Sequence, residues 1–271
     1  MFRAIFTLHG FLYLAQSLVL ILLKNVLKTI QGIYSGETGL SSSPPMSWRN
    51  SSLDRITLIS NSDAHSPSHI AREANVFDTE LSYQGIVETI KSKDPKRLLY
   101  TIEFYPEEGK YYYDGHRNCG ISLSPQETKK YNGICPVCGK PLTIGVSNRI
   151  EQLADRPRGF KPEGVIPYKS LVPLKEIISE VLGVGVATKS VDREYRRLIE
   201  KVGSELKILL GVPDSDLKSI TLPEIVEGVL RVRQGKVKVE PGYDGVYGKV
   251  RIFSQAEKNN SKNNSQRTLF S

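Results

Sequence analysis

The sequence predicts a mixed α/β fold, α+β overall, that combines an α/β region, a small zinc-binding β module and a helical domain. Three observations lead to this prediction. Short runs rich in β-branched and aromatic residues, at 56–60 and 98–105, favour strands in the first half of the chain. Cys135 and Cys138 then follow at the spacing of a zinc knuckle. After residue 170 the apolar pattern becomes helical, and each long helical segment ends at a glycine.

Composition narrows the class of protein. The chain has 271 residues, enough for two or three small domains. Its formal net charge of +8 is compatible with a polyanionic partner such as nucleic acid, although a basic solvated surface explains it equally well. The cysteine count of 3 is odd, which does not fit a closed disulfide framework. A C-x-x-C pair indicates metal or redox chemistry in a reducing compartment, so we expect a cytoplasmic protein.

The N-terminal segment differs from the rest of the chain. Residues 11–23 form an apolar run. A membrane-spanning helix needs roughly 20 apolar residues, so this run is too short and we expect no membrane partner. The core of a signal peptide has this length, and a genuine N-terminal helix or anchor is a further alternative. A stretch dense in Ser and Pro follows at 37–52.

An Asp-x-His element follows the strand predicted at 56–60. Asp63 and His65 lie two residues apart, and in an extended backbone such residues face the same side. A carboxylate and an imidazole on one side of a strand end can share a metal ion. A solvated loop aspartate and a surface histidine are the alternative. A helix is predicted to begin near Pro67 and Ser68, with His69 on its surface.

Strand-like residues at 98–113 lead into the best-defined motif of the chain. His116 and Cys119 are followed by Cys135 and Cys138, with Gly139 directly after the second pair. Zinc prefers four thiolate or imidazole ligands in a tetrahedron, and a closed set of four predicts a structural zinc ion. The alternative is a redox pair with an unrelated cysteine and histidine, but the βαβ context of a thioredoxin-like motif is missing. Asp114 is a candidate substitute ligand or neighbour of the site.

The region after residue 170 predicts helices at 171–183, 190–211 and 222–235, and then a small hairpin within 236–253. Basic side chains on the middle segment suit sequence-independent contacts with DNA phosphates, and Arg196 and Lys201 belong to the same run. The residues assigned to DNA here are Lys189, Arg193 and Arg197. A helix-hairpin-helix turn at Gly183–Gly185 is a weak possibility beside a simple tight connection.

The C-terminal stretch 254–271 is polar and predicted to be disordered. It ends in Gln266, Leu269 and Phe270, which resemble the glutamine, aliphatic and aromatic positions of a sliding-clamp peptide. A clamp pocket would bury the apolar pair while the glutamine forms hydrogen bonds at the rim. The sequence therefore predicts a sliding clamp as a partner.

Long phrases of the sequence resemble one known family. Five stretches, spread over about residues 34–253, resemble the endonuclease Q family and occur in the family's order. They are ETGLSSSPPMSWRNSSLDRITLISNSDAHSPSHIAREANVFD, KYYYDGHRNCGISLSPQE, CPVCGKPLTIGV, LGVGVATKS and EPGYDGVYG. The resemblance implies the C-terminal part of a PHP (polymerase and histidinol phosphatase) barrel-like domain. It also implies a metal-dependent endonuclease that nicks double-stranded DNA on the 5′ side of deaminated bases (uracil, hypoxanthine, xanthine) or abasic sites.

The resemblance assigns roles to single residues. Asp63 and His65 would be the last ligands of the catalytic metal cluster, which takes Mg²⁺, Mn²⁺ or Zn²⁺, and Glu37 would be a further ligand. Arg72 would face a phosphate, unless it is a plain surface arginine. The implied domains are the PHP part, the zinc module, the helical DNA-binding domain with its hairpin, and the tail, at 34–97, 98–150, 165–253 and 254–271.

The early ligands of a PHP cluster have no counterpart. The chain has 4 histidines and no His-x-His, so the resemblance implies an incomplete catalytic cluster. Freely back-translated, residues 2–31 permit a shifted frame that resembles the family, and we interpret 1–33 as a frameshifted segment. Two other functions stay open: a non-catalytic zinc-containing module that binds DNA and the clamp, and a zinc-ribbon protein of transcription or RNA. The oligomeric state is not predicted.

Overall fold

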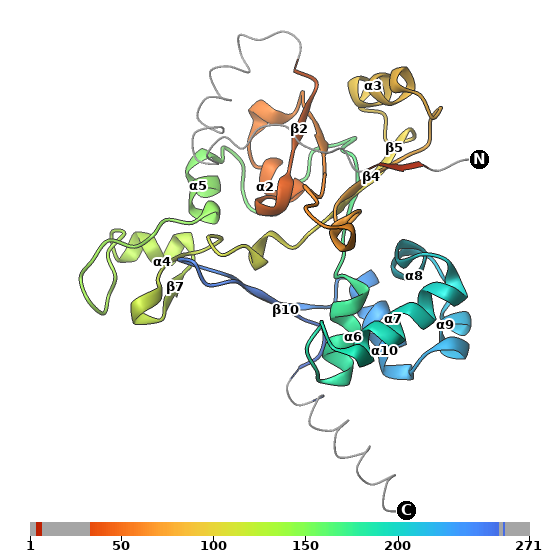
Figure 1. Cartoon of the computed structure of the whole chain (residues 1–271). Helices are drawn as coiled ribbons and strands as arrows, with labels where there is room; N and C mark the ends of the chain where they lie inside the picture. Colours follow the sequence, from red (N-terminus) through yellow and green to blue (C-terminus); the bar gives the residue numbers. More distant parts are fainter. Residues whose placement is uncertain (1–3, 7–32, 255–256, 258–271) are drawn as a thin grey trace, which may run out of the picture. The chain divides into compact units, whose positions relative to one another are not determined.

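A computed structural model describes residues 4–6, 33–254 and 257 of the chain (Figure 1). Two compact units make up the protein. The first comprises Met1–Lys169 with Pro241–Gly248, and the second comprises Ser170–Glu240 with Lys249–Ser271. The apolar run at 11–23 and nearly all of the tail lie outside the described residues. No helix in the described ranges has the length and apolar character needed to cross a membrane.

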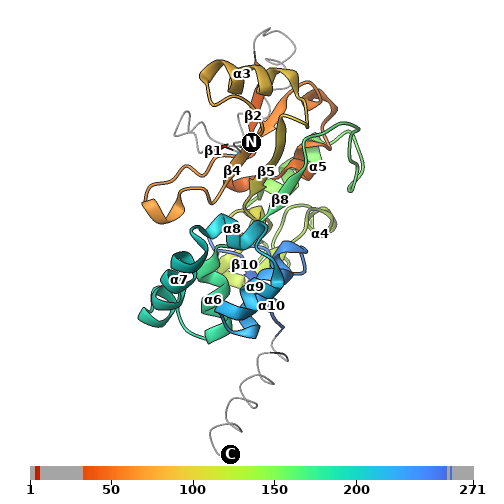
Figure 2. The same ribbon diagram turned by 90° about the vertical axis from the view of Figure 1, so that its right-hand side faces the viewer.

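The main sheet of the first unit has four strands in the order β1, β4, β5 and β8. These are Ala4–Phe6, Ala74–Phe77, Leu98–Glu103 and Tyr168–Ser170. β4 is antiparallel to both β1 and β5. Helix α3 (Tyr83–Ser92) connects β4 to β5 and lies beside them (Figure 2). Its Ile86 and Ile90 pack against the buried side chains of Phe77, Leu98 and Ile166, which form a core of this unit.

The remaining sheets of the first unit are pairs of short strands. β2 (Ser35–Glu37) and β3 (Thr57–Ile59) are parallel, and β3 confirms the strand predicted at 56–60. Helix α2 (Pro44–Ser47) lies between them in sequence. The helix predicted near Pro67 is a single 3₁₀ turn, Pro67–His69, because Ile70 leaves the helical region at ψ 133°.

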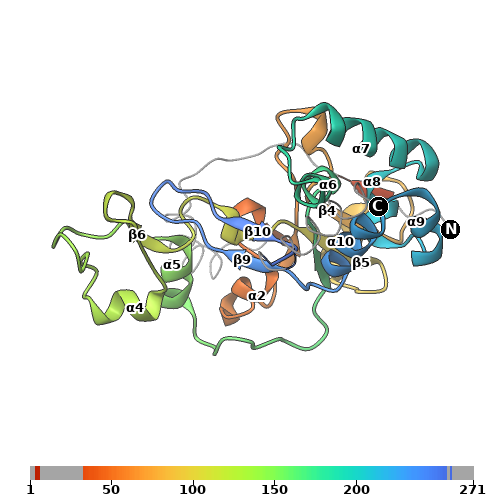
Figure 3. The same cartoon turned by 90° about the horizontal axis from the view of Figure 1, so that it is seen from below.

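We use the name Cys/His module for residues 114–153 of the first unit. It contains the antiparallel strands β6 and β7 and the helices α4 and α5, which contact one another; Figure 3 labels β6, α4 and α5. Their bounds are Asp114–His116, Ile121–Leu123, Pro125–Lys130 and Val146–Leu153. A capping box at Ser124 and Glu127 fixes the start of α4, because each satisfies a backbone N–H of the other.

The second unit is a helical cluster with a two-stranded hairpin. Its helices are α6 (Leu174–Leu182), α7 (Lys189–Val202), α8 (Glu205–Leu210), α9 (Asp214–Ile220) and α10 (Pro223–Arg233). The hairpin strands are β9 (Lys238–Glu240) and β10 (Lys249–Arg251), which run antiparallel (Figure 3). The fully buried side chains of the helices form the core, among them Leu174, Ile177, Ile178, Val191, Leu198, Ile208, Leu217 and Ile225.

Two details of the helical unit differ from the sequence prediction. The helical segment 190–211 is broken by Gly203, which has a φ of +98° and ends α7, while Ser204 caps the start of α8. Helix α9 was not predicted. Its seven residues contain one buried side chain, Leu217, so its apolar periodicity is too short to detect in sequence.

Candidate metal and nucleic-acid sites

The four residues predicted to bind zinc come together in the Cys/His module. His116 ends β6, and Cys119 ends the 3₁₀ turn that follows it. Cys135 and Cys138 lie in a tight turn in which the Gly139 N–H donates to the Cys135 carbonyl at 2.9 Å. Each ligand pair is followed by a glycine in the left-handed region, Gly120 at φ +65° and Gly139 at φ +71°. The module therefore consists of two similar knuckles.

The ligand atoms of these four residues all lie within 4.8 Å of one another, and Cys138 Sγ is 3.4 Å from His116 Nδ1. In a tetrahedral site with bonds of about 2.3 Å to sulfur and about 2.0 Å to nitrogen, the ligand atoms would be about 3.5–3.8 Å apart. All three cysteines are free thiols. The donor set and its dimensions therefore fit one metal ion with no open position.

The pKa values of the neighbouring thiols shift in opposite directions: that of Cys119 is raised, by desolvation and by its hydrogen bonds to Cys138 and Cys135, and that of Cys135 is lowered. The Cys135 side chain is only 2% exposed. Desolvation raises the pKa of this thiol, but the backbone N–H groups of Cys138 and Val137 donate to its sulfur, and the resulting pKa is about 7. Asp114 is fully buried and accepts hydrogen bonds from the Gly145 N–H and the Asn148 amide. It therefore fastens α5 to β6 and is not one of the metal-ligating side chains.

Glu37 and Asp63 lie at the same end of a parallel strand pair. Glu37 is the last residue of β2, and Asp63 follows β3 in a left-handed conformation with φ +43°. Burial is the main cause that raises the pKa of Glu37; a hydrogen bond from Asn61 opposes this rise, and the negative charge of Asp63 adds to it. The two carboxylates are thus close enough to influence each other.

His65 is exposed, and its Nδ1 lies 2.8 Å from the backbone carbonyl oxygen of Asp63. Among the described residues, the ligand atoms of the Cys/His set come within mutual reach, whereas Glu37, Asp63 and His65 do not belong to any group of three or more such atoms. In this arrangement, therefore, these three residues do not by themselves fit a metal ion.

Two buried carboxylates that sequence reasoning missed lie in the same unit. Glu73, just before β4, and Glu103, at the end of β5, are both fully buried. Burial, reinforced by repulsion from Glu103, raises the pKa of Glu73 to about 8. Burial raises the pKa of Glu103 to about 7, although hydroxyl groups donate to it, including Thr38 Oγ1 at 2.8 Å. A glutamate inside an apolar strand, as in TIEFY, was the available sequence signal.

Arg72, predicted to face a phosphate, lies against side chains of its own unit. Its guanidinium carbon is 3.9 Å from the centroid of the Phe104 ring, and its Nη2 is 3.8 Å from Glu108 Oε2. Its Nε is buried without a hydrogen-bond partner in the described part of the chain. The Arg72 side chain is thus held by two contacts, and its one donor without a partner is buried.

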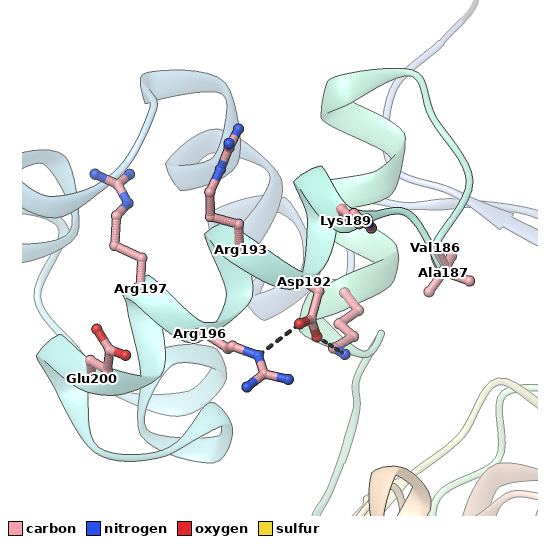
Figure 4. A pocket seen from close by; sticks show the side chains of 9 residues that line it. Val186, Ala187, Lys189, Asp192, Arg193, Arg196, Arg197 and Glu200 are labelled. Carbon is pink, nitrogen blue, oxygen red and sulfur yellow. Dashed lines mark hydrogen bonds and ion pairs between the residues drawn. The ribbon is translucent and has the colours of Figure 1, made fainter.

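The DNA-contact residues predicted in the second unit line a pocket of about 680 Å³ along α7 (Figure 4). Lys189, Arg193 and Arg197 recur on one face of the helix, and Val186 and Ala187 border the pocket. Asp192 pairs with Arg196 at 2.7 Å, which a dashed line marks in Figure 4, and with Lys175 at 2.8 Å.

Ion pairs divide the cations of this pocket into two groups. Glu194 pairs with Arg197 at 2.6 Å, so this arginine, like Arg196, already has a carboxylate partner. Lys189 and Arg193 make no ion pair within the described ranges, 4–6, 33–254 and 257. These two side chains are therefore the cations of the pocket that are most available to an added anion. The predicted clamp residues Gln266, Leu269 and Phe270 lie outside the described residues.

Comparisons with known proteins match both units. A family model for the MJ0043 C-terminal domain matches residues 173–236. The chain is 33% identical over 231 residues to MJ0043 of Methanocaldococcus jannaschii, covering 81% of this chain and 28% of that protein. It is 29% identical over 217 residues to YqxK of Bacillus subtilis, covering 79% of this chain and 52% of that protein. The chain thus spans about a quarter to a half of the length of these curated relatives.

Two solved structures have the same fold. The lesion-specific endonuclease PfuEndoQ of Pyrococcus furiosus matches with a TM-score of 0.72 and 30% identity, over 83% of this chain and 57% of that one. Endonuclease Q bound to a 27-mer duplex with an abasic lesion at its active site matches with a TM-score of 0.70 and 28% identity, over 85% and 60%. These matches confirm the predicted resemblance: the chain is similar in sequence and in fold to endonuclease Q over most of its own length.

Proposed function

We propose that this protein acts in DNA repair as an endonuclease of the endonuclease Q type, on double-stranded DNA that contains deaminated bases or abasic sites. The observation that supports this most strongly is the common fold with an endonuclease Q bound to a duplex with an abasic lesion. The basic pocket along α7 is compatible with such a polyanionic partner.

In this proposal each region has a distinct task. Residues 34–97 are the C-terminal part of a PHP domain. Glu37, Asp63 and His65 are metal ligands there, and the metal site is complete only when further ligands join them. The Cys/His set holds a structural zinc ion, because four soft ligands leave no position for water. Bound divalent metal would activate water and neutralise phosphoryl oxygens. The nick is expected on the 5′ side of uracil, hypoxanthine or xanthine.

A second candidate is a non-catalytic module that binds damaged DNA and a sliding clamp. It is favoured by one observation, that Glu37, Asp63 and His65 are absent from the groups of described residues able to hold a metal ion. In this case zinc and the DNA contacts are retained without phosphodiester hydrolysis. Gln266, Leu269 and Phe270 would then tether the chain to the clamp.

A nicking assay separates the two candidates. The full chain is incubated with Mg²⁺ or Mn²⁺ and a duplex with one uracil or inosine, beside the intact duplex. Nicks 5′ of the lesion that disappear in Asp63→Asn but not in Asp78→Asn support the endonuclease. Binding to the lesion duplex without any nick supports the non-catalytic module, and the absence of both binding and nicking contradicts both candidates.

The basic pocket provides an independent test of DNA as the partner. Lys189→Ala and Arg193→Ala are each expected to weaken duplex binding and to reduce the slope of log affinity against log salt by about 1. Arg196→Ala is the matched control, because its guanidinium already pairs with Asp192 and its loss should have a smaller effect. Equal effects of all three variants would contradict a specific role for the two unpaired cations.

A further inference from the structure

Tyr111 and Tyr247 are far apart in sequence, yet in the first unit they flank one lysine. The ammonium nitrogen of Lys110 lies 5.7 Å from the ring centroid of each tyrosine. Both rings are open to solvent, with exposures of 48% for Tyr111 and 69% for Tyr247. The other two tyrosines of the YYY run, Tyr112 and Tyr113, are half-buried and stack on each other, with centroids 5.4 Å apart. Tyr111 is therefore the one of the three whose ring is most available to a partner.

Backbone hydrogen bonds hold the loop that carries Tyr247. The Gly245 N–H donates to the Lys110 carbonyl at 2.8 Å, and the Gly248 N–H donates to the Glu108 carbonyl at 3.0 Å. Asp244 accepts hydrogen bonds from the Arg117 N–H at 2.6 Å and from Thr143 Oγ1 at 2.7 Å. Because these bonds fix the backbone that carries Tyr247 before any partner arrives, little backbone conformational entropy remains to be lost on binding.

The chemistry of this surface suits a nucleotide. An exposed aromatic ring can stack on any base, and a lysine beside it can contact the adjoining phosphate. A second cation is close, because Arg117 and the Tyr111 hydroxyl both lie near Gly245. A Cβ built at this glycine would be 3.3 Å from Nη1 of Arg117 and 3.9 Å from the hydroxyl oxygen of Tyr111. In the described part of the chain Lys110 makes cation-π contacts and no ion pair.

We propose that Tyr111, Tyr247 and Lys110 form a platform that stacks on an unpaired base and contacts its phosphate. This inference rests on the proposed function, because it takes DNA as the partner. An enzyme that acts on a damaged base needs that base or its neighbour outside the stack, so a platform for unpaired bases would favour lesion duplexes over intact ones. The platform assigns this preference to the first unit.

The test uses the full zinc-loaded chain and two duplexes, one intact and one with 2-aminopurine opposite an abasic site. Affinity is measured by anisotropy, and stacking is measured by the change in 2-aminopurine fluorescence. Tyr247→Leu and Tyr111→Leu are each expected to weaken binding to the abasic duplex about tenfold, and binding to the intact duplex much less. Tyr247→Phe should behave like the unchanged protein, because it keeps the aromatic face.

Tyr83→Leu is the matched control, because Tyr83 is 83% exposed in the same unit and outside the platform. Zinc content and circular dichroism verify that each variant is folded. If the leucine variants keep the preference for the abasic duplex and the fluorescence change, the platform is excluded even though the chain binds DNA. If the unchanged protein binds neither duplex, the proposed function itself fails, so the two failures are distinguishable.

Discussion

The Cys/His set and the carboxylates at the strand ends of the first unit are assembled in opposite ways. The Cys/His ligands come from two local turns, and their ligand atoms lie within 4.8 Å of one another. Glu37, Asp63, Glu73 and Glu103 come from separate segments, and burial raises the pKa of three of them. The local site is thus complete in itself, whereas Glu73 and Glu103 are held in a protein interior that disfavours their charge. We infer that the Cys/His set stabilises the fold and that the carboxylates need further groups to neutralise their negative charge.

The largest effect is expected from breaking the local site. Cys135→Ser, or removal of zinc by a chelator, should unfold the Cys/His module, because structural zinc contributes ~10–16 kcal/mol in small zinc-binding peptides. The helices of the second unit should remain folded. Zinc content and amide hydrogen exchange along the chain measure both outcomes.

Val137→Ser is the control for that experiment, because Val137 is 66% exposed in the same turn and is not a ligand. A chain that loses zinc while its Cys/His module keeps full hydrogen-exchange protection would show that the ion is dispensable for folding.

The second largest effect is expected from the buried carboxylates, through the pH dependence of stability. Glu73 has a pKa of about 8 in the folded chain against an ordinary value of 4.5, so the folded state binds a proton that the unfolded state has lost. The contribution of Glu73 to stability is therefore full below about pH 4.5. It falls as pH rises to about 8, by at most about 1.4 kcal/mol per pH unit. Glu73→Gln should remove the part of this fall that comes from Glu73 and make the protein more stable than its parent near pH 9.

Urea unfolding between pH 5 and pH 9 measures this difference, with Glu80→Gln at an exposed position of the same unit as the control. A parent protein whose stability does not fall over this range would show that the Glu73 carboxyl is neutralised by another group. The same curve for Glu103→Gln should show a smaller effect, because the pKa of Glu103 is about 7.

The smallest effect tests whether the Cys/His module depends on a distant segment. A Cβ at Gly242 would lie 2.5 Å from the Gly109 carbonyl oxygen, so Gly242→Ala should displace the loop 241–248 and cost about 1–3 kcal/mol. Gly211→Ala is the control, because a Cβ there would meet no atom within 4 Å. Thermal unfolding compares the two variants. An unchanged melting temperature for Gly242→Ala would mean that the close approach of the loop to Gly109 does not contribute to stability.

The sequence was most informative where the determining interactions are local. The spacing of His116, Cys119, Cys135 and Cys138 was sufficient to group the ligands, because each pair needs only one turn and a following glycine. The strand at 56–60 and the glycine-terminated helix α6 were predicted for the same reason. Metal-ligand spacing and helix capping depend on neighbouring residues, which a sequence displays directly.

Tertiary structure alone decided the features that depend on burial or on distant partners. It buried Glu73 and Glu103. It also brought Tyr247 beside Lys110 and held Arg72 against Phe104. Among the residues that the structure describes, it also left Lys189 and Arg193 without an ion pair, while Asp192 and Glu194 paired with the arginines beside them. The physical reason is that desolvation and pairing are set by residues far away in sequence, so the same glutamate or lysine can be solvated, neutral or paired according to the packing around it.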